Sequence, residues 1–273
     1  LKIMWEKVQE TVSFIKNKTN FTAEYGVILG SGLGGFTADI TIEHLLPYSE
    51  IPNFPVSTVQ GHNGALVFGT IGTKKVIAMQ GRFHFYEGYD MKKVTFPVRV
   101  MKYLGVEKLI VSNASGGVNI NYKVGDVVVI TDHINMMPEH PLRGYNEERF
   151  GPRFVNMSAP YSKPMSRKAF EIAKSLTIEL KSGIYLALQG PTFETLAEYN
   201  MVKNLGADCV GMSTVPEVIV ARHMNMECFG VSVITDMGDI ENMEEVNHEE
   251  VLQAAQKAEP QVRNLIKHLI LQY

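Results

Sequence analysis

Arg82 and His84 are the two residues whose types and spacing most clearly suggest chemistry. They stand two positions apart in GRFHFYEGY, so in an extended segment both side chains point to the same face. A guanidinium offers a planar fork of donors that fits two phosphate oxygens, and a nearby histidine adds another donor. An arginine after a strand is also a common surface ion-pair partner. The pair therefore predicts an anion site only if further donors converge on it.

Further donors follow the apolar segments of the chain. Six predicted strands end in small, polar or glycine residues, and α/β sheets bind ligands beyond the carboxyl ends of their strands. These stretches are residues 30–32, 81–84, 113–117, 189–194, 211–214 and 235–236. The pattern predicts one composite pocket, in which Ser31, Ser213 and the backbone amides of residues 113–117 join Arg82 around a free phosphate.

The glycine-rich stretch GSGLGG also matches a dinucleotide-binding pattern through Gly30, Gly32 and Gly35. A dinucleotide site needs a helix that begins inside the motif, then a strand that ends in an acidic residue about 20 positions on. Three prolines interrupt the segment that follows, namely Pro47, Pro52 and Pro55. They disfavour a regular crossover unit. A phosphate-holding loop fits this stretch best, with a tight turn that binds nothing as the alternative.

A second group of residues suits an organic substrate. It contains two aromatic rings, a thioether and two carboxylates, from Tyr86, Phe193, Glu194, Met212 and Asp236. Such side chains fit a planar heterocycle beside a sugar. Each also has a structural interpretation, because Met and Phe fill cores and a glutamate in the first turn of a helix is favoured by the helix dipole. The residues alone thus predict a phosphate and a small cyclic substrate.

The elements that must position these residues alternate along the chain. Helical spacing predicts helices at 4–17, 93–104, 165–180, 194–205, 216–226 and 248–270, the last opened by Asn247 and Glu250 as a capping box. Apolar runs predict strands at 25–29, 108–112, 126–131, 184–189, 207–212 and 228–235, and a hairpin at 64–69 and 74–80. We expect an α/β fold with a largely parallel but mixed sheet, as a single domain over residues 1–273. Residues 132–163 form a long irregular stretch, either functional or a surface excursion.

Composition narrows the class of protein. The chain has 273 residues, 26 basic and 29 acidic side chains and 45% hydrophobic residues, as in a globular protein that binds neither nucleic acid nor an anionic membrane. No window is long and apolar enough for a membrane span. The two cysteines, Cys209 and Cys228, predict buried free thiols in a reducing, cytoplasmic setting. No cysteine or histidine spacing predicts a metal site.

Long strings of the chain resemble the trimeric purine nucleoside phosphorylases. The strings are ILGSGLGGF, EIPNFPVSTVQGHNG, MQGRFHFYEGY, VTFPVRVMKYLGV, NASGGVN, GPTFETLAEY and VGMSTVPEVIVARH. The resemblance implies a mixed sheet that closes into a distorted barrel surrounded by helices. It implies reversible phosphorolysis of inosine or guanosine, and of their deoxyribonucleosides, to a free purine and (deoxy)ribose 1-phosphate in purine salvage. It also implies that phosphate is a co-substrate and that neither a metal nor an organic cofactor takes part.

The resemblance also implies roles for individual residues. The phosphate would be held by Ser31, His62, Arg82, His84, the Ala114 amide and Ser213. The ribose would contact Tyr86, Met212 and His248, with His248 near the 5′-hydroxyl. The base would contact Phe193, Glu194 and Asp236, and His84, Glu194 and Asp236 would be catalytic. Phe154 would reach into the site of a neighbouring subunit of a homotrimer.

Asp236 departs from the pattern of the family members specific for 6-oxopurines, which carry asparagine there. An ionised aspartate can only accept hydrogen bonds, so it faces a purine O6 with like polarity. Two outcomes are open: a protonated Asp236 that donates to N7 or O6, or an ionised one that accepts from a 6-amino group and admits adenosine. Glu194 favours a purine with N1–H, which keeps inosine and guanosine first. Met237 stands where some members carry lysine.

Two rival functions remain at this point. A methylthioadenosine phosphorylase of the same superfamily would need an apolar pocket at the 5′ end, whereas His248 favours a free hydroxyl. A non-catalytic nucleoside-binding relative would bind the same ligands without releasing base.

Overall fold

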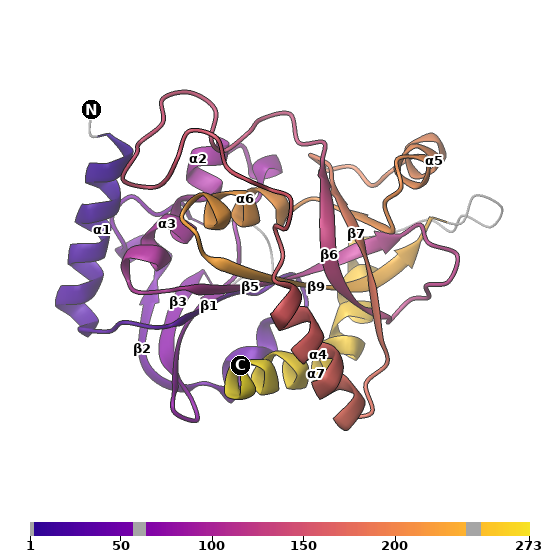
Figure 1. Ribbon diagram of the computed structural model, residues 1–273, viewed down its shortest axis with the longest axis horizontal. Coiled ribbons are helices and arrows are strands. Elements are labelled where there is room, and N and C mark those ends of the chain that lie inside the picture. Colours follow the sequence, from indigo (N-terminus) through magenta and orange to yellow (C-terminus); the bar gives the residue numbers. More distant parts are fainter. Residues whose placement is uncertain (1–2, 57–63, 239–246) are drawn as a thin grey trace.

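A mixed β-sheet forms the centre of the molecule (Figure 1). The computed structural model describes residues 3–56, 64–238 and 247–273. In this part of the chain the strands follow the order β2–β3–β4–β1–β5–β8–β7–β6–β9. Their bounds are β1 Tyr25–Ile28, β2 Thr41–Pro47, β3 Ala65–Ile71, β4 Lys74–Gln80, β5 Lys108–Gly117, β6 Val127–Asn135, β7 Leu180–Ala187, β8 Cys209–Gly211 and β9 Glu227–Met237.

Part of this sheet closes on itself. Strand β9 pairs with β6 on one side and with β5 on the other, so β5, β8, β7, β6 and β9 form a closed ring. Strand β1 runs parallel to β4 and β5, whereas β2, β3 and β4 form an antiparallel meander. The predicted mixed sheet with a distorted barrel is confirmed.

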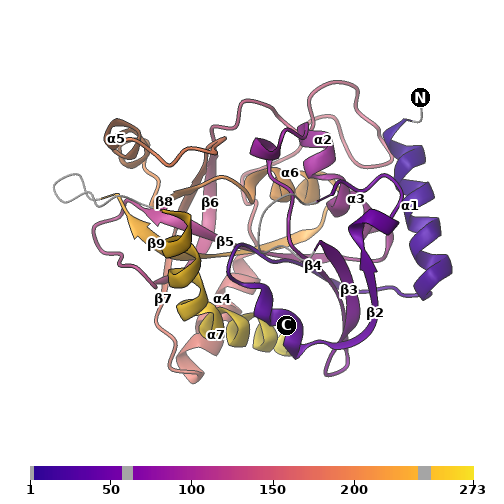
Figure 2. The same ribbon diagram turned by 180° about the vertical axis from the view of Figure 1, so that it is seen from behind.

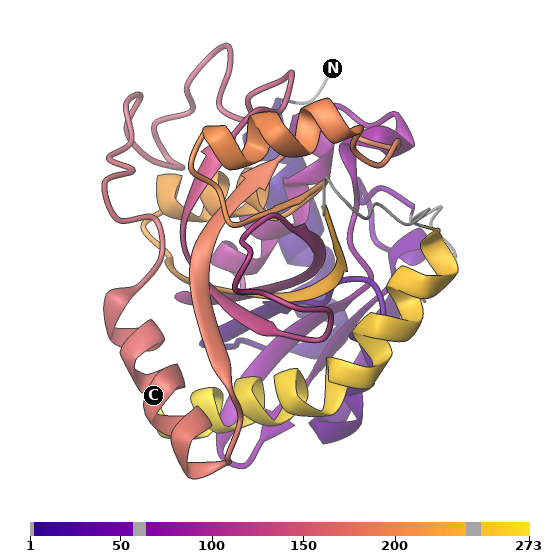
Figure 3. The ribbon, with the colours of Figure 1, turned by 90° about the vertical axis from the view of Figure 1, so that its right-hand side faces the viewer.

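Helices cover both faces of the sheet (Figures 2 and 3). They are α1 Met4–Thr19, α2 Met91–Val94, α3 Phe96–Tyr103, α4 Lys163–Ser175, α5 Leu196–Asn204, α6 Val215–His223 and α7 His248–Gln272. Successive strand residues belong to different cores, because side chains alternate across a strand. Ile28 and Val111 pack with α1, α3 and α6, whereas their neighbours Val27 and Ile110 pack with α4 and α7. Within the described residues no helix is long and apolar enough to cross a bilayer.

Several boundaries differ from the sequence-based expectations. The predicted helix at 93–104 is two helices that meet at Thr95, with Pro97 in the first turn of α3, where its missing N–H costs nothing. The helices predicted to reach 180 and 226 end at Ser175 and His223. Thr177 and Asn225 have positive φ angles of 57°, which turn the chain out of each helix.

Strand β2 was not predicted. Its side chains are largely exposed because it is an edge strand, so it shows no apolar alternation, and its proline stands at the last position. The cap of α7 is confirmed, since the Asn247 side chain accepts from the Glu250 backbone N–H at 3.0 Å.

Candidate active site

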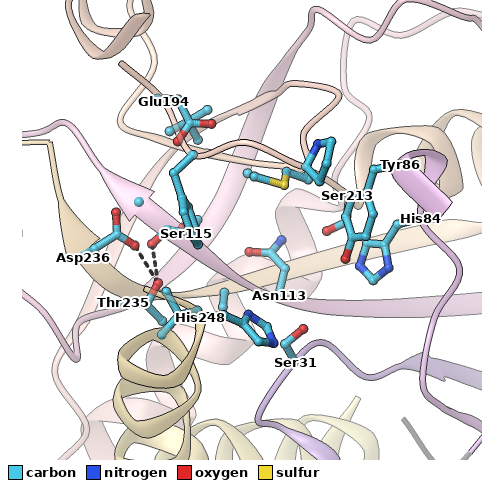
Figure 4. Close-up of a pocket in the computed structure, with 18 of the residues that line it drawn as sticks. Ser31, His84, Tyr86, Asn113, Ser115, Glu194, Ser213, Thr235, Asp236 and His248 are labelled. Atoms are coloured by element: carbon cyan, nitrogen blue, oxygen red, sulfur yellow. Dashed lines mark hydrogen bonds between the residues drawn. The ribbon is translucent and has the colours of Figure 1, made fainter. Parts of the chain in front are cut away.

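A cavity of about 390 Å³ lies where the predicted strand ends meet. Each of the six predicted stretches contributes to its wall, together with the start of α7 (Figure 4). The site residues predicted from the sequence that line it are Ser31, Arg82, His84, Tyr86, Ala114, Phe193, Glu194, Met212, Ser213, Asp236 and His248. The sequence therefore predicted the composition of this pocket closely.

Two predicted residues remain, and only one of them lies in the part of the chain that the structure describes. His62 lies outside the described residues. Phe154 follows β6 in the long irregular loop and is 88% exposed, so it contributes nothing to the cavity of its own chain. Its predicted contact was with a neighbouring subunit, and that prediction stays untested.

Arg82 is the most buried cation of the site, with only 1% of its surface exposed. Its Nε donates to Glu217 Oε1 at 3.1 Å, and its Nη1 donates to the Ser112 carbonyl at 2.8 Å and to Ser213 Oγ at 3.1 Å. Its Nη2 has no hydrogen-bond partner among the residues that the structure describes. A buried charged donor of this kind is costly unless a ligand satisfies it, which indicates an anion-binding role.

His84 lies beside Arg82 in a tight local network. Its ring stacks on Tyr86 with centroids 4.7 Å apart, and its Nδ1 is 3.2 Å from Glu87 Oε1, which also accepts from the His84 backbone N–H at 2.7 Å. Burial lowers the pKa of His84, and the nearby Arg82 lowers it further, although Glu87 opposes both effects. The imidazole is therefore neutral near pH 7.

The glycine-rich stretch is held directly against the middle of β5, which continues to Gly117, beyond the strand end predicted at residue 112. Gly30 N–H donates to Ser112 Oγ at 3.1 Å, and a Cβ at Gly30 would lie 2.7 Å from both Asn113 Cα and the Ser112 carbonyl oxygen. Only glycine permits this approach. It brings Ser31 to the same wall as Asn113 and Ala114, at the end of the cavity that contains Arg82.

Two carboxylates, the buried Glu194 and the half-buried Asp236, form another part of the wall. Figure 4 shows them across the cavity from His84 and Tyr86. Burial raises the pKa of Glu194 to about 7, with a further contribution from the negative charge of Asp236. Burial also raises the pKa of Asp236. The cavity thus has a cationic donor region and an acidic region.

Two hydroxyls fix the Asp236 carboxylate. Thr235 Oγ1 donates to Asp236 Oδ1 at 2.9 Å, and Tyr199 Oη donates to Asp236 Oδ2 at 3.0 Å. The sequence does not predict the Tyr199 contact, because a lone tyrosine at a helical position is typical of a core residue. No pattern of spacing links it to a residue 37 positions away.

The comparisons with known proteins agree with this geometry. Residues 24–271 match the phosphorylase superfamily. The chain is 49% identical to purine nucleoside phosphorylase 1 of Bacillus subtilis, a match that covers 99% of this chain and 100% of the relative. It is 50% identical to the mouse (Mus musculus) purine nucleoside phosphorylase, covering 97% of this chain and 94% of the relative.

Solved structures give the same result. The structure of Schistosoma mansoni purine nucleoside phosphorylase in complex with adenosine has a TM-score of 0.93 at 41% identity, over 98% of this chain and 97% of that one. A complex of isoform 2 from the same organism with cytosine and ribose-1-phosphate has a TM-score of 0.94 at 41% identity, over 98% and 96%. On sequence, fold and site, this chain belongs to the purine nucleoside phosphorylases of the phosphorylase superfamily.

Proposed function

We propose that this enzyme catalyses the reversible phosphorolysis of inosine and guanosine, including their deoxyribonucleosides, and that it also accepts adenosine. The products would be a free purine and (deoxy)ribose 1-phosphate, as in purine salvage. One observation carries the proposal: a buried arginine with an unpaired donor lines a single cavity of nucleoside size together with two carboxylates, of which one is buried and one half-buried.

Inorganic phosphate belongs at the Arg82 region. Arg82 supplies a fixed positive charge, and Ser31, Ser213 and the Ala114 amide supply neutral donors on neighbouring walls. Because Glu217 and Ser112 already hold the guanidinium, its orientation is set before phosphate arrives. A neutral His84 can accept the hydrogen of a monoprotonated phosphate at the ring nitrogen that does not face Glu87.

The bound phosphate is both nucleophile and charge stabiliser. When the glycosidic bond breaks, positive charge develops on the sugar and negative charge on the departing purine. A phosphate dianion held against the sugar stabilises the first charge. Holding both substrates together also makes the encounter effectively unimolecular, which lowers the barrier by up to ~7–11 kcal/mol in favourable cases. The ribose would lie between these regions, near Tyr86, Met212 and His248.

The purine belongs beside Phe193, Glu194 and Asp236. An ionised Glu194 accepts the N1–H of a 6-oxopurine, and its pKa of about 7 makes a large fraction of it ionised at neutral pH. A protonated Asp236 can donate to N7 and stabilise the leaving base. An ionised Asp236 can accept from a 6-amino group. The adenosine complex of the Schistosoma enzyme supports the inclusion of adenosine.

A methylthioadenosine phosphorylase is the second candidate. Its substrate replaces the 5′-hydroxyl with an apolar thioether. His248, which begins α7 and lines the cavity, favours the hydroxyl because it offers a hydrogen bond. A non-catalytic relative remains the third candidate, and it differs by releasing no base.

An inosine assay with and without added phosphate tests the proposal. We expect hypoxanthine release that depends on phosphate and consumes it in equal amount. Methylthioadenosine turnover faster than inosine turnover would favour the second candidate. Absence of base release with both substrates, in protein that binds hypoxanthine, would favour the third.

We further propose a cytoplasmic homotrimer that uses neither metal nor organic cofactor. The resemblance to trimeric enzymes and the exposed Phe154 support the trimer. Cys209 and Cys228 are buried free thiols, as expected in a reducing compartment. The described residues contain no group of three or more His, Cys, Asp or Glu side chains suited to a metal ion. His62 would complete the phosphate site.

A further inference from the structure

Tyr199, in α5, contacts one carboxylate of the proposed base site and lies near the other. It is 1% exposed, and its hydroxyl donates to Asp236 Oδ2 at 3.0 Å. Glu194 lies near the same hydroxyl, because its negative charge helps to raise the pKa of Tyr199. A phenol has one O–H, so it can donate to only one of these two carboxylates at a time. A substitution at Tyr199 therefore changes the surroundings of the carboxylates that would face the base.

Two glycines leave the space that the ring and the hydroxyl of Tyr199 occupy. A Cβ at Gly116 would lie 2.8 Å from Asp236 Oδ2 and 3.2 Å from Tyr199 Oη, and a Cβ at Gly238 would lie 2.4 Å from the ring atom Cδ1. The Thr195 cap fixes the start of α5, since its side chain accepts from Glu198 N–H and Glu198 reaches back to Thr195 N–H. The contact between Tyr199 and Asp236 thus depends on glycine at positions 116 and 238 and on the capped start of α5.

The consequence concerns the direction in which Asp236 makes hydrogen bonds. Tyr199 Oη donates to Oδ2, and Thr235 Oγ1, which also lies 3.3 Å from the Ser115 carbonyl oxygen, is the nearer donor to Oδ1, so a hydroxyl of the protein faces each carboxylate oxygen. Such donors favour the ionised carboxylate, which can only accept. An accepting Asp236 complements the amino group of a 6-aminopurine and opposes the O6 of a 6-oxopurine.

We propose that Tyr199 is a specificity-determining positioning residue, which holds Asp236 as a hydrogen-bond acceptor and thereby raises the affinity for 6-aminopurines relative to 6-oxopurines. The inference rests on the proposed function, because it assumes that a purine faces Asp236. The charged and titratable groups around Asp236 are Glu194 and Tyr199 on the α5 side, with Glu198 acting on Glu194, and His248 of α7 across the cavity. Thr235 and the backbone of Gly116 complete its surroundings.

Calorimetric titration with adenine and with hypoxanthine, in saturating phosphate, tests this role in Tyr199→Phe. The variant keeps the ring that fills the slot and loses only the hydroxyl. We expect the ratio of the adenine Kd to the hypoxanthine Kd to rise about tenfold, the scale of one hydrogen bond to a charged group. Tyr122→Phe is the matched control, because its hydroxyl donates to the Ser182 carbonyl at 2.8 Å outside the cavity. Its ratio should equal that of the unmodified enzyme.

Two further measurements distinguish positioning from a general structural effect. In an Asp236→Asn background, Tyr199→Phe should change the ratio less than about twofold, because no carboxylate remains for the hydroxyl to stabilise. The affinity for adenine should fall at low pH, where Asp236 is protonated. In Tyr199→Phe this acid limb should lie at higher pH, because Asp236 becomes harder to ionise. If Tyr199→Phe does not fold, Gly116→Ala replaces it, since the added methyl pushes on the same carboxylate oxygen and predicts the same shift.

The inference is overturned if folded Tyr199→Phe keeps the original ratio and acid limb, or if the ratio changes equally in the Asp236→Asn background. Calorimetric titration with the free purines needs no catalytic turnover. An enzyme that binds both bases but never cleaves inosine would therefore contradict the proposed function, while the Tyr199 comparison would still be decided.

Discussion

Arg82 Nε and Glu217 Oε1 form an ion pair 3.1 Å apart in which both side chains are almost completely buried. Arg82 comes from the segment after β4 and Glu217 from the first turn of α6, so the pair ties the phosphate region to a helix 135 residues away. Glu217 offsets the cost of burying the guanidinium and sets its direction.

Glu217→Ala should therefore lower both stability and phosphate binding. Removing one partner of a buried pair leaves an uncompensated charge, which costs about 3–5 kcal/mol of the free energy of unfolding. Denaturant unfolding measures that loss, and the KM for phosphate should rise more than the KM for inosine. Glu217→Gln keeps an acceptor for Nε and serves as the milder control. An unchanged phosphate KM in folded Glu217→Ala would show that Arg82 needs no partner for its orientation.

Asp236→Asn should shift the enzyme toward 6-oxopurines. An asparagine amide can donate to O6 while its carbonyl accepts from N7–H, which an ionised aspartate cannot do. The ratio of kcat/KM for inosine to kcat/KM for adenosine should rise by the equivalent of roughly 1–3 kcal/mol, the scale of one buried unpaired group. Steady-state assays with both nucleosides measure it. Met237→Leu, at the neighbouring position, adds no donor and controls for a general change at the end of β9.

Glu194 should make the reaction depend on pH near neutrality. Its pKa is raised to about 7, so the carboxylate that accepts N1–H is present above that pH and is lost as the pH falls. The kcat/KM for inosine should drop about tenfold per pH unit on the acid side. Adenosine has no N1–H, so its profile should lack this limb. Glu194→Gln removes the titrating group, and a variant profile that still falls below pH 7 would assign the limb to another residue.

The sequence predicted the wall of the cavity better than its internal contacts. Strand ends can be predicted from apolar runs, and their glycines and hydroxyls mark the ligand edge, so the sequence alone predicts Ser31, Arg82, Ser213 and Asp236 at the cavity that they line. Side-chain contacts between residues far apart in the sequence leave no such pattern. Glu217 beneath Arg82 and Tyr199 behind Asp236 stand at helical positions that read equally well as first-turn charge and core filler.

Strand β2 also leaves no readable pattern in the sequence, which explains why it was not predicted. Burial creates the periodic pattern from which strands are predicted, and an edge strand with exposed side chains carries little of it. Only its antiparallel pairing with β3 defines it, and that pairing is a property of the folded sheet.

Phe154→Ala should test whether a neighbouring subunit completes the site. Phe154 is 88% exposed on the long loop and lies outside its own cavity, where its ring packs into no core of its own chain and lies only against Arg153, whose Cζ is 6.0 Å from the ring centroid. If it closes the base or ribose site of a partner, Phe154→Ala should raise the inosine KM about tenfold or more, while the unfolding temperature stays within a few degrees. Tyr145→Ala, which removes another exposed aromatic of the same loop, is the matched control. Sedimentation should give a trimer for all three proteins, and a fully active monomer would remove any role for Phe154 in the site of a neighbour.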